Sequence, residues 1–184
     1  IINIMILPYM GIHPKIHESV YICEGALIVG DVVLEKDVSV WYNTVVRGDV
    51  NYIRVGERTN IQDGAILHNT YQKYPLVIGN DVTIGHGAIV HGCTVKDHVL
   101  IGLGAKLLDD CVIGENSFIA AGTLVKEHFQ VPEGVLVAGV PGKIIRDLRP
   151  EEIEKIKKSA ENYLMYVRNY KEDAKVWVTK EAGS

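Results

Sequence analysis

Cysteine is scarce and unpatterned in this chain. Its three cysteines, among 184 residues, are odd in number and form no CxxC pair, so a disulfide framework is disfavoured and a reducing, cytoplasmic location fits best. No apolar run reaches the roughly 20 residues that a membrane-spanning helix needs. The apolar opening, residues 1–7, has no basic segment and no small-residue cleavage site. It therefore indicates a first strand, or extraneous sequence, rather than a signal peptide.

Dense blocks of basic residues are also missing. The chain has 19 lysines and arginines against 23 acidic residues, a formal net charge of −4. This balance lacks the electrostatic footprint of a nucleic-acid-binding protein. With 47% hydrophobic residues, the chain is long enough for one domain with a substantial core.

Aliphatic residues instead recur every six positions along most of the chain. A period of six fits neither an α-helix nor a simple strand, but it fits a short strand plus a tight turn, three of which form one triangular coil. Each coil stacks only on its neighbours, so the predicted core is a continuous column. Glycines such as Gly85 and Gly102 follow repeat positions, where turns need a permissive backbone. The repeat positions are Ile16, Ile22, Ile28, Leu34, Val40 and Val46, then Val55, Ile61 and Leu67, then Ile78, Ile84 and Val90, and finally Val95, Ile101, Leu107, Ile113, Ile119, Val125, Val131 and Val137.

The segments IGNDVT, IGHGAI, IGLGAK and IGENSF resemble the hexapeptide-repeat superfamily of left-handed β-helices. The resemblance implies the hand of the coil, which spacing alone does not give. The predicted fold is therefore mainly β: a left-handed parallel β-helix over residues 1–149. From Pro150 to about Tyr170 the apolar period becomes helical, which predicts a C-terminal α-helix packed along the β-helix. Residues 150–184 are expected to belong to the same structural unit.

The breaks in the repeat indicate where the chemistry lies. If each break is a loop inserted into one repeat, then Val46, Leu67 and Val90 are one full coil apart. The residues that follow them, Arg47, His68 and His91, then stack along one edge at about the 4.8 Å spacing of parallel strands. His86 lies one repeat before His91, on another side of the prism, so one chain does not easily bring all three imidazoles to one ion. In a trimer, His86 of one chain can face His68 and His91 of the next.

Three imidazoles with one open position are typical of a catalytic zinc site. A single histidine in such a fold is more often a surface or structural residue, and the chain has seven. Two histidines in register, with the third in a Gly-His-Gly turn, favour a shared metal site. Imidazole ligands suit Zn²⁺, and equally Fe²⁺ or Co²⁺.

Four segments carry a closer resemblance. They look like the γ-class carbonic anhydrases, from about Pro8 to the C-terminal helix: Val46-Arg47-Gly48-Asp49, Asn60-Ile61-Gln62-Asp63-Gly64, Leu67-His68, and residues 84–93. The resemblance implies a homotrimer with metal at each subunit interface, held by His68 and His91 of one chain and His86 of its neighbour. It also implies an Arg47–Asp49 network, polar roles for Gln62 and Asp63, and a site tyrosine at Tyr163. The reaction would be reversible hydration of CO₂ to bicarbonate.

Several of these roles have structural alternatives. Arg47 can pair bidentately with Asp49, or with Asp63 of the adjacent chain, and this pairing can be catalytic or only an interface salt bridge. Gln62 can hydrogen-bond a metal-bound water or bicarbonate. Tyr163 is either a site residue or part of the packing stripe of the helix. Trp41 and Tyr42 are expected to be interface or packing aromatics, with lining of the site as the alternative.

The chain also departs from the best-known active γ-class enzyme. The stretch after the first ligand histidine, residues 69–75, is short and has no carboxylate, and Val50 and Asn51 replace an acidic residue expected after Arg-Gly-Asp. Two other hypotheses therefore remain open. One is a hexapeptide acyltransferase or thioesterase that acts on a CoA ester. The other is a metal-binding assembly module without catalysis.

Overall fold

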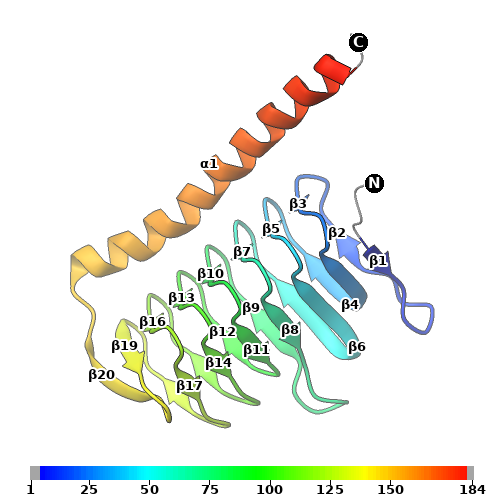
Figure 1. Ribbon diagram of the computed structural model, residues 1–184. Helices are drawn as coiled ribbons and strands as arrows, with labels where there is room; N and C mark the ends of the chain where they lie inside the picture. Colours follow the sequence, from blue (N-terminus) through cyan, green and yellow to red (C-terminus); the bar gives the residue numbers. More distant parts are fainter. Residues whose placement is uncertain (1–4, 182–184) are drawn as a thin grey trace.

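The computed structural model describes the backbone of residues 5–181 and the side chains of residues 5–173. These residues form a parallel β-helix followed by one long helix, α1 (Pro150–Glu181). Figure 1 shows the strands stacked as successive coils of a column, with α1 running back along one side of it. Nothing helical in residues 5–181 combines the length and hydropathy needed to cross a bilayer.

The column has three faces, which form two hydrogen-bonded sheets because β4 and β6 each continue around one corner. The first face contains β1 (Met5–Leu7), the first half of β4 (Leu27–Leu34) and of β6 (Val45–Val55), β8 (Ile66–His68), β11 (Ile89–His91), β14 (Lys106–Leu107) and β17 (Leu124–Val125). The second contains β2 (Lys15–Ile16), the second half of β4 and of β6, β9 (Leu76–Ile78), β12 (Thr94–Val95), β15 (Val112–Ile113) and β18 (Gln130–Val131). The third contains β3 (Tyr21–Ile22), β5 (Ser39–Val40), β7 (Asn60–Ile61), β10 (Thr83–Ile84), β13 (Leu100–Ile101), β16 (Phe118–Ile119), β19 (Val135–Ala138) and β20 (Lys143–Asp147).

The six-residue repeat predicts this core correctly. From Ile28 to Val137 every repeat position is buried, and Ile16 and Ile22 are partly buried at the first coils. The expected strand at the start is present for the described residues 5–7, which pair with β4 as β1. Residues 1–4 lie outside the described part of the chain.

At Gly85 and Gly102, glycine is needed for a different reason from the one expected. Gly85 and Gly102 do not adopt the left-handed backbone conformation that turns often require. A Cβ at Gly85 would lie 2.8 Å from the carbonyl oxygen of Ile101, and one at Gly102 would lie 2.5 Å from the amide nitrogen of Ala121. Glycine is therefore needed here because adjacent coils approach closely.

Two features at the C-terminal end differ from the expectation. The turn after Val137 leads first into β20, which pairs antiparallel with β19, and only then into the helix. Its apolar pair, Ile144 and Ile145, lies outside the six-residue period and is exposed, so no periodic pattern marks this strand. The helix then continues to Glu181, beyond the apolar stripe that ends near Tyr170.

Helix α1 packs on the third face, as Figure 1 shows. Ile156 and Ala160 of the helix are buried, and the hydroxyl of Ser159 lies 3.3 Å from that of Thr83 on β10. The helix therefore covers the outer side of the face that leads into the His86 turn.

Candidate metal centre

His68 and His91 end two adjacent strands on the first face. They are direct partners in the parallel ladder between β8 and β11, and Val46 pairs with Leu67 one coil earlier. The predicted vertical register of this edge is thus present. The two imidazole centroids are 5.1 Å apart, and Nδ1 of His68 lies 3.1 Å from Nε2 of His91.

A carboxylate holds the other nitrogen of each ring. Nε2 of His68 lies 3.1 Å from Oδ1 of Asp49, and Nδ1 of His91 lies 2.5 Å from Oδ1 of Asp109. Arg47 donates to the remaining oxygen of Asp49, 2.5 Å from its Nη1. The Arg47–Asp49 pair therefore forms within one chain.

Charge and burial both act on this cluster. Burial raises the pKa of Asp49, but hydrogen bonds from Arg47 and His68 outweigh it and leave the pKa below its ordinary value. Burial lowers the pKa of His68, although the hydrogen bond to Asp49 opposes this. The protonated ring is therefore disfavoured, which suits a neutral imidazole ligand.

Sequence reasoning missed Asp109, although the sequence holds a signal for it. The step from Val90 to Val95 is five residues instead of six, so the corner after His91 is one residue shorter than the corner on the next coil. The amide of Asp110 donates to the carbonyl of Gly92, which places the Asp109 side chain next to His91. Thr70, from the loop after His68, donates its hydroxyl to the other oxygen of Asp109 at 2.5 Å.

His86 lies at a different corner, in the turn between β10 and β11. Its side chain is 51% exposed, and its Nδ1 lies 2.6 Å from Oδ2 of Asp63 one coil earlier. The half-exposed ring can therefore reach a partner outside its own chain.

Aromatic side chains surround this second group. A hollow of about 320 Å³ is lined by Trp41, Tyr42, Asp63, His86, Tyr163, Tyr166 and Tyr170. Tyr163 lines it from α1, and burial raises the pKa of this phenol to about 12, with help from the charge of Asp63. Trp41 and Tyr42, expected to be interface or packing residues, line the same hollow as His86.

Gln62 is buried beside this hollow. Its Nε2 donates to Oδ1 of Asn60 at 3.1 Å, and Asn60 in turn donates to the hydroxyl of Thr83 at 3.0 Å. Gln62 also lines a neighbouring cavity of about 240 Å³ beneath α1, together with Ser159 and Phe118. The amide orientation is thus fixed by a hydrogen-bond chain along the third face.

The predicted site residues therefore form two groups on one chain. Arg47, Asp49, His68 and His91 lie at the corner between the first and second faces. Asp63, His86 and Tyr163 lie at the corner between the third and first faces. Across the described part of the chain, no three histidine, cysteine, aspartate or glutamate side chains are grouped so that they could hold a metal ion. The strands of the first face separate the two groups.

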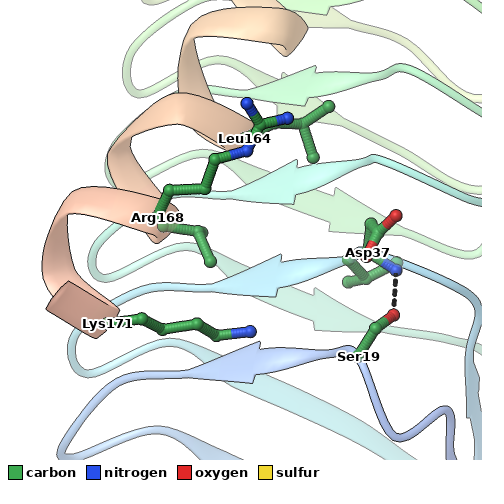
Figure 2. A pocket seen from close by; sticks show the side chains of 7 residues that line it. Ser19, Asp37, Leu164, Arg168 and Lys171 are labelled. Atoms are coloured by element: carbon green, nitrogen blue, oxygen red, sulfur yellow. Dashed lines mark hydrogen bonds between the residues drawn. The ribbon is translucent and has the colours of Figure 1, made fainter.

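Figure 2 shows another cavity, of about 140 Å³, between α1 and the turns of the first coils. Lys171 extends from the helix toward the turn where the amide of Asp37 donates to the hydroxyl of Ser19 at 2.8 Å, and Arg168 also lines the cavity. No predicted site residue lines this cavity. We therefore place the candidate site at the two histidine corners.

Comparison with known sequences identifies the family. No family model matches the chain. The chain is 47% identical over 153 residues to a probable carbonic anhydrase of Methanocaldococcus jannaschii, a match that covers 83% of this chain and 94% of that one. It is 41% identical over 167 residues to a carbonic anhydrase of Geobacillus kaustophilus, covering 91% of each chain. It is also 44% identical over 156 residues to the mitochondrial gamma carbonic anhydrase 2 of Arabidopsis thaliana, covering 82% of this chain.

The chain belongs to the γ-class carbonic anhydrase family. It spans 56% of the length of the two Arabidopsis members that it matches. Among solved structures, it is similar to a protein of Bacillus cereus described as a putative acetyltransferase, with a TM-score of 0.90 and 40% identity over 92% of this chain and 98% of that one. A hexapeptide transferase family protein of Anaplasma phagocytophilum matches with a TM-score of 0.87 and 43% identity, over 90% and 98% of the two chains. These likenesses confirm the left-handed hexapeptide-repeat β-helix of this γ-class family member.

Proposed function

We propose that this γ-class family member catalyses the reversible hydration of CO₂ at a divalent metal shared between two subunits. The observation that carries the proposal is the pair of ring nitrogens that face each other, His68 Nδ1 and His91 Nε2, at 3.1 Å. A carboxylate oxygen accepts the proton of the other nitrogen on each ring. With both rings neutral, two lone pairs then point toward one another.

Facing lone pairs need a cation between them. A shared proton would give one ring a positive charge, which burial of His68 disfavours. A divalent ion satisfies both nitrogens while both rings stay neutral, and imidazole nitrogen suits Zn²⁺, with Fe²⁺ and Co²⁺ as alternatives. The residues of this corner therefore fit two ligands of a metal site.

The third ligand would be His86 of a neighbouring subunit. Within one chain His86 lies at the opposite edge of the first face, half exposed and oriented by Asp63. In a closed ring with head-to-tail contacts, each interface joins one corner of one chain to the other corner of the next. A homotrimer would thus contain three equivalent sites, each with His68 and His91 from one chain and His86 from its neighbour.

The bound ion would supply Lewis acidity that lowers the pKa of a water molecule. The chain's own residues would hold the ligand histidines in place and line the space for the substrate. Arg47 fixes Asp49, which holds His68, whereas the hollow of Trp41, Tyr42 and Tyr163 offers an apolar wall for an uncharged substrate such as CO₂. Residues 69–75 have no carboxylate to accept protons, so we expect turnover to rise with buffer concentration.

The alternative activity is acyl transfer or hydrolysis of a CoA ester. It is favoured by the description of the similar Bacillus cereus structure as a putative acetyltransferase. Such chemistry needs a histidine nitrogen that is free to take a proton from the substrate, whereas the nitrogens of His68 and His91 that do not contact carboxylates face each other. His86, whose Nδ1 contacts Asp63 and whose ring is half exposed, would be the base in that case.

Metal analysis and two assays on the same sample separate the functions. The protein is purified without added metal, analysed for metal per chain, and assayed for CO₂ hydration and for acetyl-CoA hydrolysis. We expect one metal per chain and hydration that His91→Ala abolishes, with His128→Ala as the control. Hydration that persists in His91→Ala would overturn the proposal. Metal without either activity would instead support an assembly module.

Mixing two inactive variants tests the shared site directly. One variant carries His86→Ala and the other carries both His68→Ala and His91→Ala. After unfolding and joint refolding, random assortment pairs intact His86 with intact His68 and His91 at about a quarter of the interfaces. We expect metal binding to return in the mixture to about that level. No return in a mixture of correctly sized trimers would show that the ligands do not come from two chains.

We also propose a cytoplasmic location. Cys23, Cys93 and Cys111 are all buried free thiols. Free thiols of this kind fit a reducing compartment.

A further inference from the structure

We propose that Asp109 is a positioning residue of the metal centre, and that Thr70 holds it in place. Asp109 would determine which nitrogen of His91 is offered to the ion. This inference rests on the proposed function, and it gives a role to the short loop of residues 69–75.

Both oxygens of the Asp109 carboxylate have partners. Oδ1 lies 2.5 Å from Nδ1 of His91, and Oδ2 accepts the hydroxyl of Thr70 at 2.5 Å. Because the carboxylate accepts the proton of Nδ1, the imidazole is held in the tautomer whose Nε2 has a free lone pair. That Nε2 atom is the one that faces His68.

The loop fixes Thr70 through its backbone. The amide of Thr70 donates to the carbonyl of Tyr74 at 3.0 Å, and the carbonyl of Thr70 accepts from Lys73 at 3.2 Å and from Nδ2 of Asn51 at 3.2 Å. The hydroxyl is therefore directed at Asp109 by a closed turn. In this chain the loop would act by holding the carboxylate of Asp109, which in turn orients the ligand His91.

The two carboxylates of the corner are held differently. Asp49 is paired with the guanidinium of Arg47, whereas Asp109 is held by the neutral hydroxyl of Thr70. A carboxylate that is not hydrogen-bonded to a guanidinium polarises its imidazole more strongly. We therefore expect the loss of Asp109 to weaken metal binding more than the loss of Asp49.

Zinc affinity of the full chain provides the first test, with Zn²⁺ alone in competition with a chromophoric chelator. Asp109→Asn is expected to bind zinc about 10- to 100-fold more weakly, the range typical for partners of metal-ligating histidines. The matched control is Asp110→Asn, because the neighbouring Asp110 contacts His128 at 2.8 Å instead of His91. The control is expected to bind zinc like the unmodified chain. Equal affinity in Asp109→Asn and Asp110→Asn would overturn the proposal.

Thr70 provides a second variant that does not touch a histidine. Thr70→Val keeps the shape and removes the hydroxyl, whereas Thr70→Ser keeps the hydroxyl. We expect Thr70→Val to bind zinc more weakly than the unmodified chain, and Thr70→Ser to bind it as tightly. If both variants bind zinc equally, Thr70 does not act through its hydroxyl.

A readout without metal separates this proposal from the proposed function. In the metal-free, ¹⁵N-histidine-labelled protein, the His91 ring signal, assigned by its loss in His91→Gln, should show a protonated Nδ1. In Asp109→Ala we expect that proton to move to Nε2. An unchanged His91 signal would reject the role of Asp109 even if zinc binds. A changed signal in a protein that never binds zinc would keep the contact and reject the metal site.

Discussion

The rings of Trp41 and Tyr163 meet edge to face, with centroids 5.3 Å apart and an interplanar angle of 78°. Trp41 comes from the turn after β5 and Tyr163 from α1. Through this contact the helix forms one side of the hollow that His86 also lines. The Tyr163 phenol is protonated at neutral pH, and burial raises its pKa further, to about 12, so it can donate a hydrogen bond there.

Tyr163→Phe separates packing from participation in the site. The ring contact with Trp41 is retained, so we expect an unchanged melting temperature. Loss of one hydrogen-bond donor should lower CO₂ hydration by about tenfold, which corresponds to about 1.4 kcal/mol. Thermal unfolding and stopped-flow hydration measure the two effects. An unchanged hydration rate would assign Tyr163 to packing alone.

Removal of the metal should destabilise the protein. An ion that binds only the folded state stabilises it by about 2.7 kcal/mol when its free concentration is 100 times its dissociation constant. For a chain of this size, we expect chelation to lower the melting temperature by about 5–10 °C. In His68→Ala the chelator should have no effect. A chelator effect in that variant would indicate a metal site elsewhere.

Close stacking of the coils predicts a severe effect at Gly102. A Cβ there would lie 2.5 Å from the backbone nitrogen of Ala121, which has no freedom to move aside. Gly102→Ala should therefore lower the free energy of unfolding by about 1–3 kcal/mol. The control is Gly104→Asn, since Gly104 has a φ of 64° that asparagine tolerates, and a Cβ there would meet no atom of the described residues within 4 Å. Denaturant unfolding should show little change in this control.

Acid should weaken the junction between β20 and α1. Hydrogen bonds from Arg146 and Arg149 hold the pKa of Glu152 far below its ordinary value of 4.5. Because the folded-state pKa is lowered, this contribution to stability is present above about pH 4.5 and is lost as the pH falls toward the folded-state value. The effect should be small, since these side chains are in contact with solvent.

Glu152→Gln should thus lower the melting temperature at pH 7 and have less effect at pH 3. Glu154→Gln is the control, because Glu154 has a lysine contact at 3.4 Å on the same helix. Thermal scans across this pH range give the comparison. Equal pH dependence in the two variants would contradict the role of Glu152.

The sequence predicted the fold well because one physical rule is repeated. Each repeat position from Ile28 to Val137 is buried in the core, and the breaks before His68 and His91 keep the register of successive coils. That register places His68 and His91 at one corner and His86, one repeat before His91, at another. The chain's periodicity therefore determines both the core and the place of the candidate ligands.

Features outside the repeat could not be predicted in the same way. Asp109 contacts His91 because a corner is one residue shorter, and Thr70 reaches it from a loop whose shape depends on hydrogen bonds to Asn51 and Tyr74. The hollow around His86 depends on how α1 docks, which places Tyr163 against Trp41. These contacts join segments that the six-residue period does not relate.

The antiparallel strand β20 has a consequence for how copies of this chain can meet. A stack of parallel coils ends in strand edges that repeat the pattern of every coil below, so in principle it is a template for endless growth. β20 reverses the chain direction across the end of the third face, and its residues are all exposed. A second copy arriving end-on there would meet a strand of the wrong polarity. The antiparallel strand therefore opposes end-to-end stacking of copies into filaments along the column axis.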